Sequence, residues 1–189
     1  RLVDALGGRY ITAEDVNTTV RDMEWVRMET DHVVGLDRAL GGAGDPGPIT
    51  SPGSWEGVKA SLMWATGSES LAGRTVAVQG VGAVGFHLVG HLRRGGARVH
   101  VSDIDADHLV RAVQEHPGIE VVPANEIYGV PCDVFAPCAL GAVINDDTVT
   151  QLRTSIVCGS ANNILAEEDR HSQALADKGI LYAPDYVVN

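Results

Sequence analysis

The sequence lacks the features of membrane, secreted and nucleic-acid-binding proteins. No apolar run approaches the ~18 residues that a membrane-spanning helix needs. The first residues, RLVDALGGRY, have neither the apolar core nor the cleavage site of a signal peptide. Basic residues are scarce, with 14 Lys and Arg against 25 Asp and Glu, and the net charge is −11. This acidic balance argues against nucleic acid or an anionic membrane as a partner.

Cysteine is rare too, and the thiols form no recognisable motif. The three cysteines, Cys132, Cys138 and Cys158, are odd in number, which suits the reduced thiols of a cytoplasmic protein. None of them forms a C-x-x-C pair, so neither a zinc site nor a redox pair is indicated. His87 and His91 have the spacing of a metal pair, but no third ligand is evident. We therefore expect no metal. A hydrolase is disfavoured because no G-x-S-x-G motif is present.

Residues 74–105 carry the strongest functional signal. A short apolar run at 75–78 leads into Gly80-Val81-Gly82-Ala83-Val84-Gly85, which is a complete G-x-G-x-x-G motif. A helical pattern follows, and then a second apolar run at 97–101 that ends near Asp103. This order of strand, glycine turn, helix, strand and acid predicts a dinucleotide-binding unit.

Each part of this unit has a physical role. Gly80 allows the tight turn, Gly82 lets the backbone approach a pyrophosphate, and Gly85 lets the helix pack closely. The helix amino end offers free N–H groups and a positive dipole to the phosphates. A carboxylate at Asp103 can accept hydrogen bonds from both ribose hydroxyls and would repel a 2′-phosphate, which favours NAD over NADP. The alternative is a tight turn that binds nothing.

The remaining pattern predicts an α/β fold in which helices and strands alternate. We expect a doubly wound parallel sheet, a Rossmann-type NAD-binding domain at residues 49–189, and a partial second α/β domain at 1–48 that includes a hinge loop. The expected strands lie at 10–13, 75–78, 97–101, 121–122, 132–136, 155–158 and 180–182. The expected helices lie at 1–8, 20–30, 54–66, 84–92, 105–116, 146–152 and 167–178.

Two loop regions bear on domain organisation and ligand binding. Residues 35–53 are rich in glycine and proline and predict a loop or hinge between the domains. The loops that follow the parallel strands, including 137–140 and 160–163, should line one crevice with the glycine turn. Asn162 and Asn163 lie in this position, where an amide could pair with the carboxamide of nicotinamide, although asparagine is also common in ordinary loops.

The motifs together resemble the leucine/valine/phenylalanine dehydrogenase branch of the Glu/Leu/Phe/Val amino-acid dehydrogenase superfamily. They occur in order along essentially the whole chain, which makes the resemblance far more specific than the glycine turn alone. The matching stretches are 8–16 (GRYITAEDV), 44–46 (GDP), 78–82 (VQGVG), 127–130 (IYGV), 133–141 (DVFAPCALG) and 182–189 (YAPDYVVN).

The resemblance implies NAD-dependent, reversible oxidative deamination of an apolar L-amino acid to its 2-oxo acid and ammonia. Asp15 would be the catalytic aspartate, although its local pattern alone is that of a residue at the start of a helix. Ala13 and Asn189 would contact the substrate. The cofactor would contact Thr50, Gly80, Gly82, Ala83, Val84, Asp103, Ile104, Cys138, Ala139, Ala161 and Asn162.

The sequence departs from the family pattern in one important respect. Relatives carry a glycine-rich G-G-G-K stretch that supplies a catalytic lysine, and these 189 residues contain none. We therefore expect the chain to be a fragment that binds NAD but turns over poorly alone, and the full-length protein to be a homo-oligomer. The resemblance leans toward a branched-chain substrate, with phenylalanine as an alternative. A non-catalytic NAD-binding module or sensor is the competing hypothesis; a hydroxy-acid dehydrogenase would need a His–acid pair at a strand end.

Overall fold

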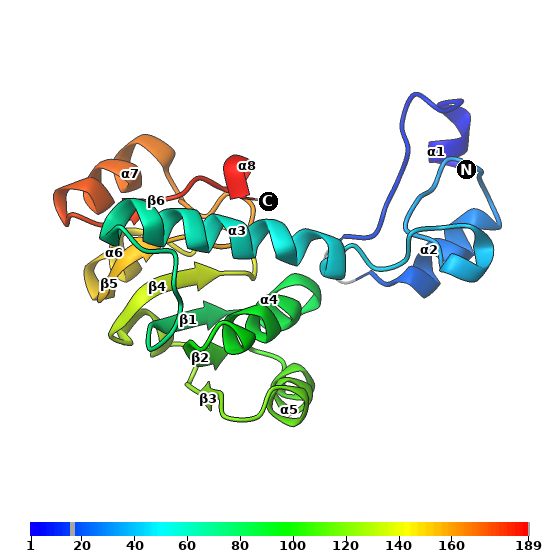
Figure 1. Ribbon diagram of the computed structural model, residues 1–189. Coiled ribbons are helices and arrows are strands. Elements are labelled where there is room, and N and C mark those ends of the chain that lie inside the picture. Colours follow the sequence, from blue (N-terminus) through cyan, green and yellow to red (C-terminus); the bar gives the residue numbers. More distant parts are fainter. Residues whose placement is uncertain (16–17, 189) are drawn as a thin grey trace. The chain divides into compact units, whose positions relative to one another are not determined.

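A computed structural model describes residues 1–15 and 18–188 (Figure 1). The chain divides into two compact units, Arg1–Pro46 and Gly47–Asn189. Each unit has its own cluster of buried side chains.

The smaller unit is built around one helix. Its elements are α1 (Leu2–Ala5), α2 (Val20–Arg27) and the 3-10 turn η1 (Arg38–Leu40). Thr19 begins α2 with a capping box, because its hydroxyl accepts from Asp22 N while the Asp22 carboxylate accepts from Thr19 N at 2.8 Å. Met23 of α2 is buried against Val33 and Leu36.

Two local predictions in this unit need comment. The strand expected at 10–13 is wrong, since only an isolated parallel bridge joins Thr12 to Val33. Apolar Tyr10 and Ile11 stay exposed, so no second layer covers them to stabilise a strand. The helix expected at 20–30 is present as α2, but it ends at Arg27, and Thr19 is its N-cap residue.

The larger unit contains one six-stranded parallel sheet in the order β3-β2-β1-β4-β5-β6. This is the doubly wound Rossmann order, so the predicted fold class is confirmed. The order reverses between β1 and β4, which pair in parallel register. The strands are β1 (Thr75–Gln79), β2 (Arg98–Ser102), β3 (Glu120–Val121), β4 (Cys132–Pro137), β5 (Thr154–Val157) and β6 (Leu181–Tyr182).

Helices cover both faces of the sheet (Figure 1). Side chains alternate along β1, so Val76 and Val78 join one buried cluster with α3, α4 and α5, while Ala77 joins another with α6, α7 and η2. Because both faces of β1 are covered, its three central side chains are all apolar, as expected for a parallel sheet between two layers of helices. The covering elements are α3 (Gly47–Thr66), α4 (Ala83–Arg94), α5 (Ala106–Glu115), η2 (Ile127–Gly129), α6 (Asp146–Gln151), α7 (Glu168–Asp177) and α8 (Asp185–Val188).

Helix α3 begins earlier than the sequence suggests. Residues 47–53 were expected to belong to the glycine- and proline-rich loop, but they form the first turns of α3. Pro48 is tolerated there because the first N–H groups of a helix have no intrahelical partner. Pro52 lies further inside the helix and has no N–H, so it removes one intrahelical backbone hydrogen bond. Packing of α3 along α4, with Val58 and Leu62 fully buried, stabilises the helix against that loss.

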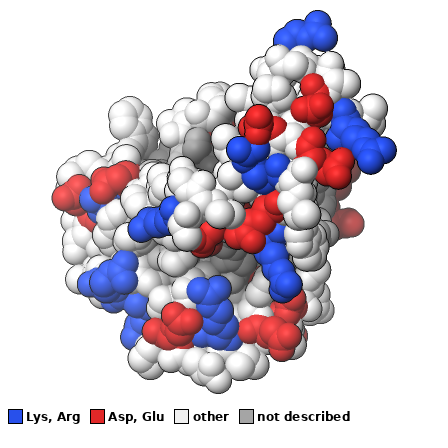
Figure 2. All heavy atoms as spheres, turned by 90° about the vertical axis from the view of Figure 1, so that its right-hand side faces the viewer, with Lys and Arg blue, Asp and Glu red and all other residues white. Residues whose placement is uncertain are grey.

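The surface carries charges of both signs. Figure 2 shows acidic and basic side chains interspersed over the face drawn there. Among the described residues, no helix combines the length and the apolar character that crossing a membrane requires.

Candidate dinucleotide site

The carboxyl ends of β1 and β4 define the candidate site. In open parallel sheets, ligands bind beyond the carboxyl ends of the strands, at the point where the strand order reverses. The glycine turn follows β1 at that point, and the loop that begins at Cys138 follows β4. Cys138 N donates to Gln79 O at 2.7 Å, so the two loops start from adjacent, hydrogen-bonded positions.

Gly80 closes the turn after β1 where no other residue would fit. Its φ is +90°, and a Cβ added there would lie 2.8 Å from Ala139 Cβ. Its N–H donates to Ser102 O of β2 at 2.7 Å. The turn is therefore held between the ends of β2 and β4, and it brings Gly80 against Ala139, two residues predicted to contact the cofactor.

Gly85 and Gly82 have opposite surroundings on α4. A Cβ at Gly85 would lie only 2.0 Å from Gly80 O and 3.1 Å from Cys138 Cβ, so the helix packs directly on the turn. A Cβ at Gly82 would meet a single neighbour within 4 Å, His108 Cε1 at 3.9 Å. The close packing expected of Gly85 is therefore present, and Gly82 leaves its backbone open to a ligand.

The amino end of α4 is suited to an anion. Gly82 is its N-cap residue and, within the part of the chain that the structure describes, no side chain caps this end. The first N–H groups of α4 belong to Ala83, Val84 and Gly85, and those of Val84 and Gly85 lack the side-chain partner that a Ser or Asp cap would supply. Together with the helix dipole, these donors fit the phosphates of a dinucleotide. The residues present fit such a cofactor.

Asp103 is held rigidly beside this helix end. Its side chain is only 10% exposed. One carboxylate oxygen accepts from Val81 N at 2.8 Å, and the other accepts from Asp105 N at 2.9 Å. A carboxylate offers about four acceptor positions, so acceptor capacity remains for a ribose. Ile104, which follows it, is 94% exposed.

The loops after β4 and β5 are joined by backbone hydrogen bonds. Ala161 N donates to Pro137 O at 2.9 Å, and Ala142 N donates to Asn163 O at 2.7 Å. Asn163 has a φ of 51°, a left-handed conformation that Asn tolerates, and its N–H donates to the Asp185 carboxylate at the start of α8. Loops after three strands are thereby fixed to one another at the carboxyl edge.

The predicted residues in these loops differ in exposure. Ala161 is buried, whereas Ala139 and Asn162 are exposed. The Cys138 thiol contacts Ser160, and burial raises its pKa more than hydrogen bonds from Ser160 lower it. Cys138 therefore stays a neutral thiol near pH 7 and has the character of a wall residue rather than a nucleophile.

Thr50 comes from a different element. It lies in the first turns of α3 and is half-buried. Further along α3, Gly57 allows close contact with the end of β5 and with α8, because a Cβ there would lie 3.3 Å from Cys158 Sγ and 3.1 Å from Val188 Cγ1. Helix α3 is therefore fixed against the carboxyl ends of the later strands.

The predicted catalytic aspartate belongs to the smaller unit. Asp15 is exposed, and its N–H donates to Thr18 Oγ1 at 2.7 Å. Ala13 is exposed on the same segment. Its neighbour Glu14 was not singled out from the sequence, yet burial, followed by the charges of Asp45 and Asp22, raises its pKa. Asn189 lies outside the described residues.

Comparison with known proteins identifies the family. A model of the Glutamate/Leucine/Phenylalanine/Valine dehydrogenase family matches residues 41–189. The chain belongs to this family. It is 50% identical to leucine dehydrogenase from Bacillus cereus and 52% identical to that from Thermoactinomyces intermedius, each over 189 residues that cover 100% of this chain and 51% of the relative.

A solved structure supports the same relationship. The crystal structure of L-tryptophan dehydrogenase from Nostoc punctiforme matches with a TM-score of 0.77 and 44% identity, covering 100% of this chain and 53% of that one. The chain thus spans about half the length of the curated relatives it matches. The predicted resemblance is confirmed, and the family together with the Rossmann-type sheet implies a nicotinamide cofactor.

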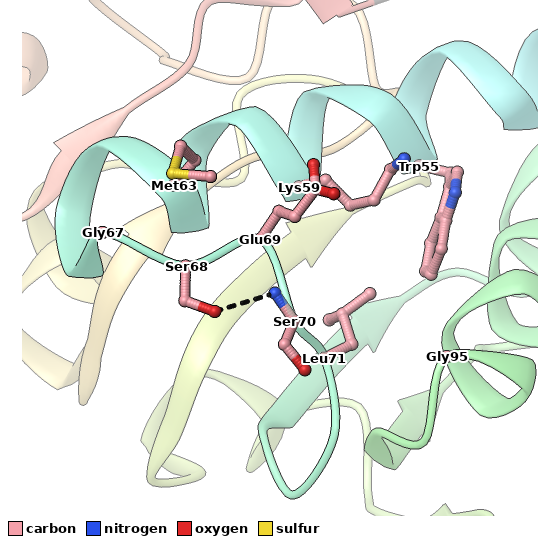
Figure 3. A pocket seen from close by; sticks show the side chains of 9 residues that line it. All are labelled: Trp55, Lys59, Met63, Gly67, Ser68, Glu69, Ser70, Leu71 and Gly95. Carbon is pink, nitrogen blue, oxygen red and sulfur yellow. Dashed lines mark hydrogen bonds between the residues drawn. The ribbon is translucent and has the colours of Figure 1, made fainter.

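A separate hollow lies at the amino ends of the strands, whereas the candidate dinucleotide site lies at their carboxyl ends. Figure 3 shows it between α3 and the loops that enter β1 and β2 at their amino ends. Its volume is about 410 Å³, and Trp55, Lys59 and Met63 line it. Lys59 already pairs with Glu56 at 2.8 Å. Doubly wound folds bind their ligands at the carboxyl edge, so this hollow is not part of the family's cofactor site.

Sequence analysis missed one side chain in the dinucleotide site. His108 Nδ1 lies 3.4 Å from the Asp103 carboxylate. The sequence indicated a helix at 105–116, but it did not show that His108, in the first turn of this helix, lies beside Gly82 and Asp103. The available signal was the Asp105 N-cap, which places His108 three residues into the helix.

Proposed function

We propose that the protein containing this chain catalyses the reversible, NAD-dependent oxidative deamination of an apolar L-amino acid to the 2-oxo acid and ammonia. The reaction class rests on the family match, and the single structural observation that carries the cofactor is the uncapped amino end of α4 beside the largely buried Asp103 carboxylate, within the described residues. The proposal extends to the full-length protein, which would be a homo-oligomer. A solved glutamate dehydrogenase from Thermus thermophilus, 25% identical with a TM-score of 0.68, is described as hetero-hexameric, which supports assembly into an oligomer but not the identity of its subunits.

The nucleotide end of the cofactor would be held by the loops after β1 and β2. Gly82, Ala83 and Val84 would donate backbone hydrogen bonds to the pyrophosphate, aided by the dipole of α4. The Asp103 carboxylate would accept from the adenosine ribose hydroxyls, and it would repel a 2′-phosphate. Ile104 would lie beside the adenosine. This arrangement supports NAD rather than NADP as the cofactor.

The nicotinamide end would lie toward the loops after β4 and β5. Cys138 and Ala139 would form one wall, Ala161 and Asn162 another, and Thr50 of α3 would contribute a hydroxyl. The Asn162 amide can both donate to and accept from a carboxamide. These neutral walls, together with the bound cofactor, would exclude water from the reacting atoms.

Proton transfer would depend on Asp15, with Ala13 and Asn189 beside the substrate. A nicotinamide held by these loops would supply the acceptor for the hydride that leaves the amino-acid Cα. The carboxylate of Asp15 would exchange protons with the substrate amine and with the water that replaces ammonia. Asp15 is exposed on the smaller unit.

A branched-chain substrate is favoured over an aromatic one. Leucine dehydrogenases from several bacteria are 49–52% identical to this chain. Phenylalanine dehydrogenase from Caldalkalibacillus thermarum is 42% identical, and L-tryptophan dehydrogenase from Nostoc punctiforme 47%.

The test is to assay the full-length protein with NAD and four substrates: L-leucine, L-valine, L-phenylalanine and L-tryptophan. We expect the highest kcat/KM with a branched-chain substrate. Asp15→Asn should lower kcat about 10²- to 10⁴-fold, the usual contribution of a general acid–base group, and leave the Kd for NAD unchanged. NAD binding without turnover of any amino acid would favour the non-catalytic module instead. Full activity in Asp15→Asn would remove Asp15 from the mechanism.

A further inference from the structure

His108 lies near both parts of the candidate dinucleotide site, the glycine turn and Asp103. It lies in the first turn of α5, where its N–H and that of Asp107 point to the Asp105 cap. Its ring approaches Gly82 of the glycine turn, because a Cβ there would lie 3.9 Å from Cε1. Its Nδ1 lies 3.4 Å from the nearer oxygen of Asp103.

The contact with Asp103 is loose enough to change with charge. At 3.4 Å it exceeds the usual 2.7–3.2 Å of a hydrogen bond. The same carboxylate oxygen already accepts from Val81 N. A neutral imidazole therefore leaves the carboxylate available to other donors, whereas an imidazolium would pair with it by a charge-assisted hydrogen bond.

We propose that His108 is a specificity-determining residue for the dinucleotide, and that its protonation weakens the preference for NAD over NADP. The inference rests on the proposed function, since it assigns a role at the same ribose. An imidazolium competes with the ribose hydroxyls for the Asp103 carboxylate and lowers its repulsion of a 2′-phosphate. It also adds a positive charge 3.4 Å from Asp103, the side chain proposed to hold that ribose. Both effects lower the ratio of the NADP Kd to the NAD Kd.

The charged groups around His108 are mainly acidic. Asp103 and Asp105 face it from the loop between β2 and α5, and Asp107 precedes it on α5. Arg111 lies one turn further along α5, where its guanidinium sits 3.8 Å from the Phe86 ring centroid of α4 and pairs with Glu115. The amino end of α4 adds a positive partial charge. Histidine is the side chain that ordinarily changes charge between pH 5 and 8, which makes the effect measurable.

The experiment measures Kd for NAD and for NADP by calorimetry on the full-length protein, between pH 6.0 and 8.5. A single charge at a half-exposed position changes an equilibrium about fivefold, and the His108 side chain is 46% exposed. We therefore expect the ratio of the NADP Kd to the NAD Kd to fall about fivefold from pH 8.5 to pH 6.0. In His108→Asn the ratio should change far less with pH.

The matched control is His91→Asn, a substitution in the last turn of α4, away from its amino end. This variant should keep the wild-type pH profile, including any contribution from titration of the NADP 2′-phosphate itself. If the wild-type ratio is constant with pH, or if His108→Asn keeps the same slope, His108 has no such role although NAD still binds. Failure of the wild-type protein to bind NAD at any pH would overturn the proposed function, and this inference with it.

Discussion

Two single substitutions in the glycine motif should have different effects: Gly85→Ala should lower the free energy of unfolding, and Gly82→Ala should weaken NAD binding. Gly85→Ala places a Cβ 2.0 Å from Gly80 O, which is backbone and cannot rotate away. The helix must then shift from the glycine turn. Overpacking of this kind typically lowers the free energy of unfolding by about 1–3 kcal/mol.

Gly82→Ala should leave the fold nearly unchanged. Its φ of −72° suits alanine, and the nearest atom to the new Cβ is His108 Cε1 at 3.9 Å. The free energy of unfolding should change by no more than about 0.5 kcal/mol. The added methyl group would, however, lie where a pyrophosphate must approach the backbone. Loss of one hydrogen bond to a charged group would weaken NAD binding about 10- to 100-fold.

Urea unfolding and calorimetry with NAD measure these two properties on the same protein samples. Each variant serves as the control for the other, since both add one methyl group to the same motif. The reasoning would be refuted if Gly82→Ala bound NAD like the wild-type protein. It would equally be refuted if Gly82→Ala were destabilised as strongly as Gly85→Ala.

Three further predictions concern side chains away from the ligand. Asp133→Ala should lower the free energy of unfolding by about 1–2 kcal/mol, because the carboxylate accepts from Thr75 N at 2.8 Å and pairs with Arg74 at 2.9 Å. An unchanged midpoint of unfolding in urea would contradict this prediction. Burial raises the pKa of the Cys158 thiol to about 12, so only about 10⁻⁴ of it is ionised at pH 8 and iodoacetamide should react with it slowly until the protein unfolds. Burial also lowers the pKa of His116, so the folded state favours the neutral imidazole. The free energy of unfolding should therefore be highest above about pH 6.5 and should decrease as the pH falls below that value, because the unfolded state then binds the proton more readily. The decrease should be smaller in His116→Leu.

The order of strands and helices in the larger unit was predictable because its patterns are local. The glycine motif, the apolar runs and the acid at Asp103 each fix one element, and the parallel order follows from their alternation. The helix expected at 105–116 is likewise present as α5, with Asp105 as its N-cap residue. These features need no knowledge of tertiary contacts.

The misplaced elements depend on contacts between distant residues. The start of α3 contains Gly47, Pro48, Pro52 and Gly53, whose composition indicates a loop, but tertiary packing on α4 overrides that preference. Helix α8 was missed because it is one short turn, whose Val188 is buried among α3 residues. The strand expected at 10–13 failed for the opposite reason, because its apolar residues remain uncovered.

The candidate site shows the same division. The glycine turn and Asp103 were found from spacing, whereas the contact of His108 with Asp103 requires the path of the chain between β2 and α5. Likewise, the hydrogen bond from Gln79 Nε2 to Tyr128 Oη, at 2.7 Å, joins residues 49 positions apart. Sequence patterns gave the chemistry of the site, and the fold determines which side chains surround it.

The central claim is that the crevice after β1 and β4 binds NAD through Asp103. The most direct measurement is a calorimetric titration of the full-length protein and of Asp103→Asn with NAD and with NADP. We predict that the wild-type protein binds NAD clearly more tightly than NADP, and that Asp103→Asn, which keeps the side-chain shape but removes its charge, narrows the difference. Equal binding of the two dinucleotides by the wild-type protein, or an undiminished preference in Asp103→Asn, would contradict the account.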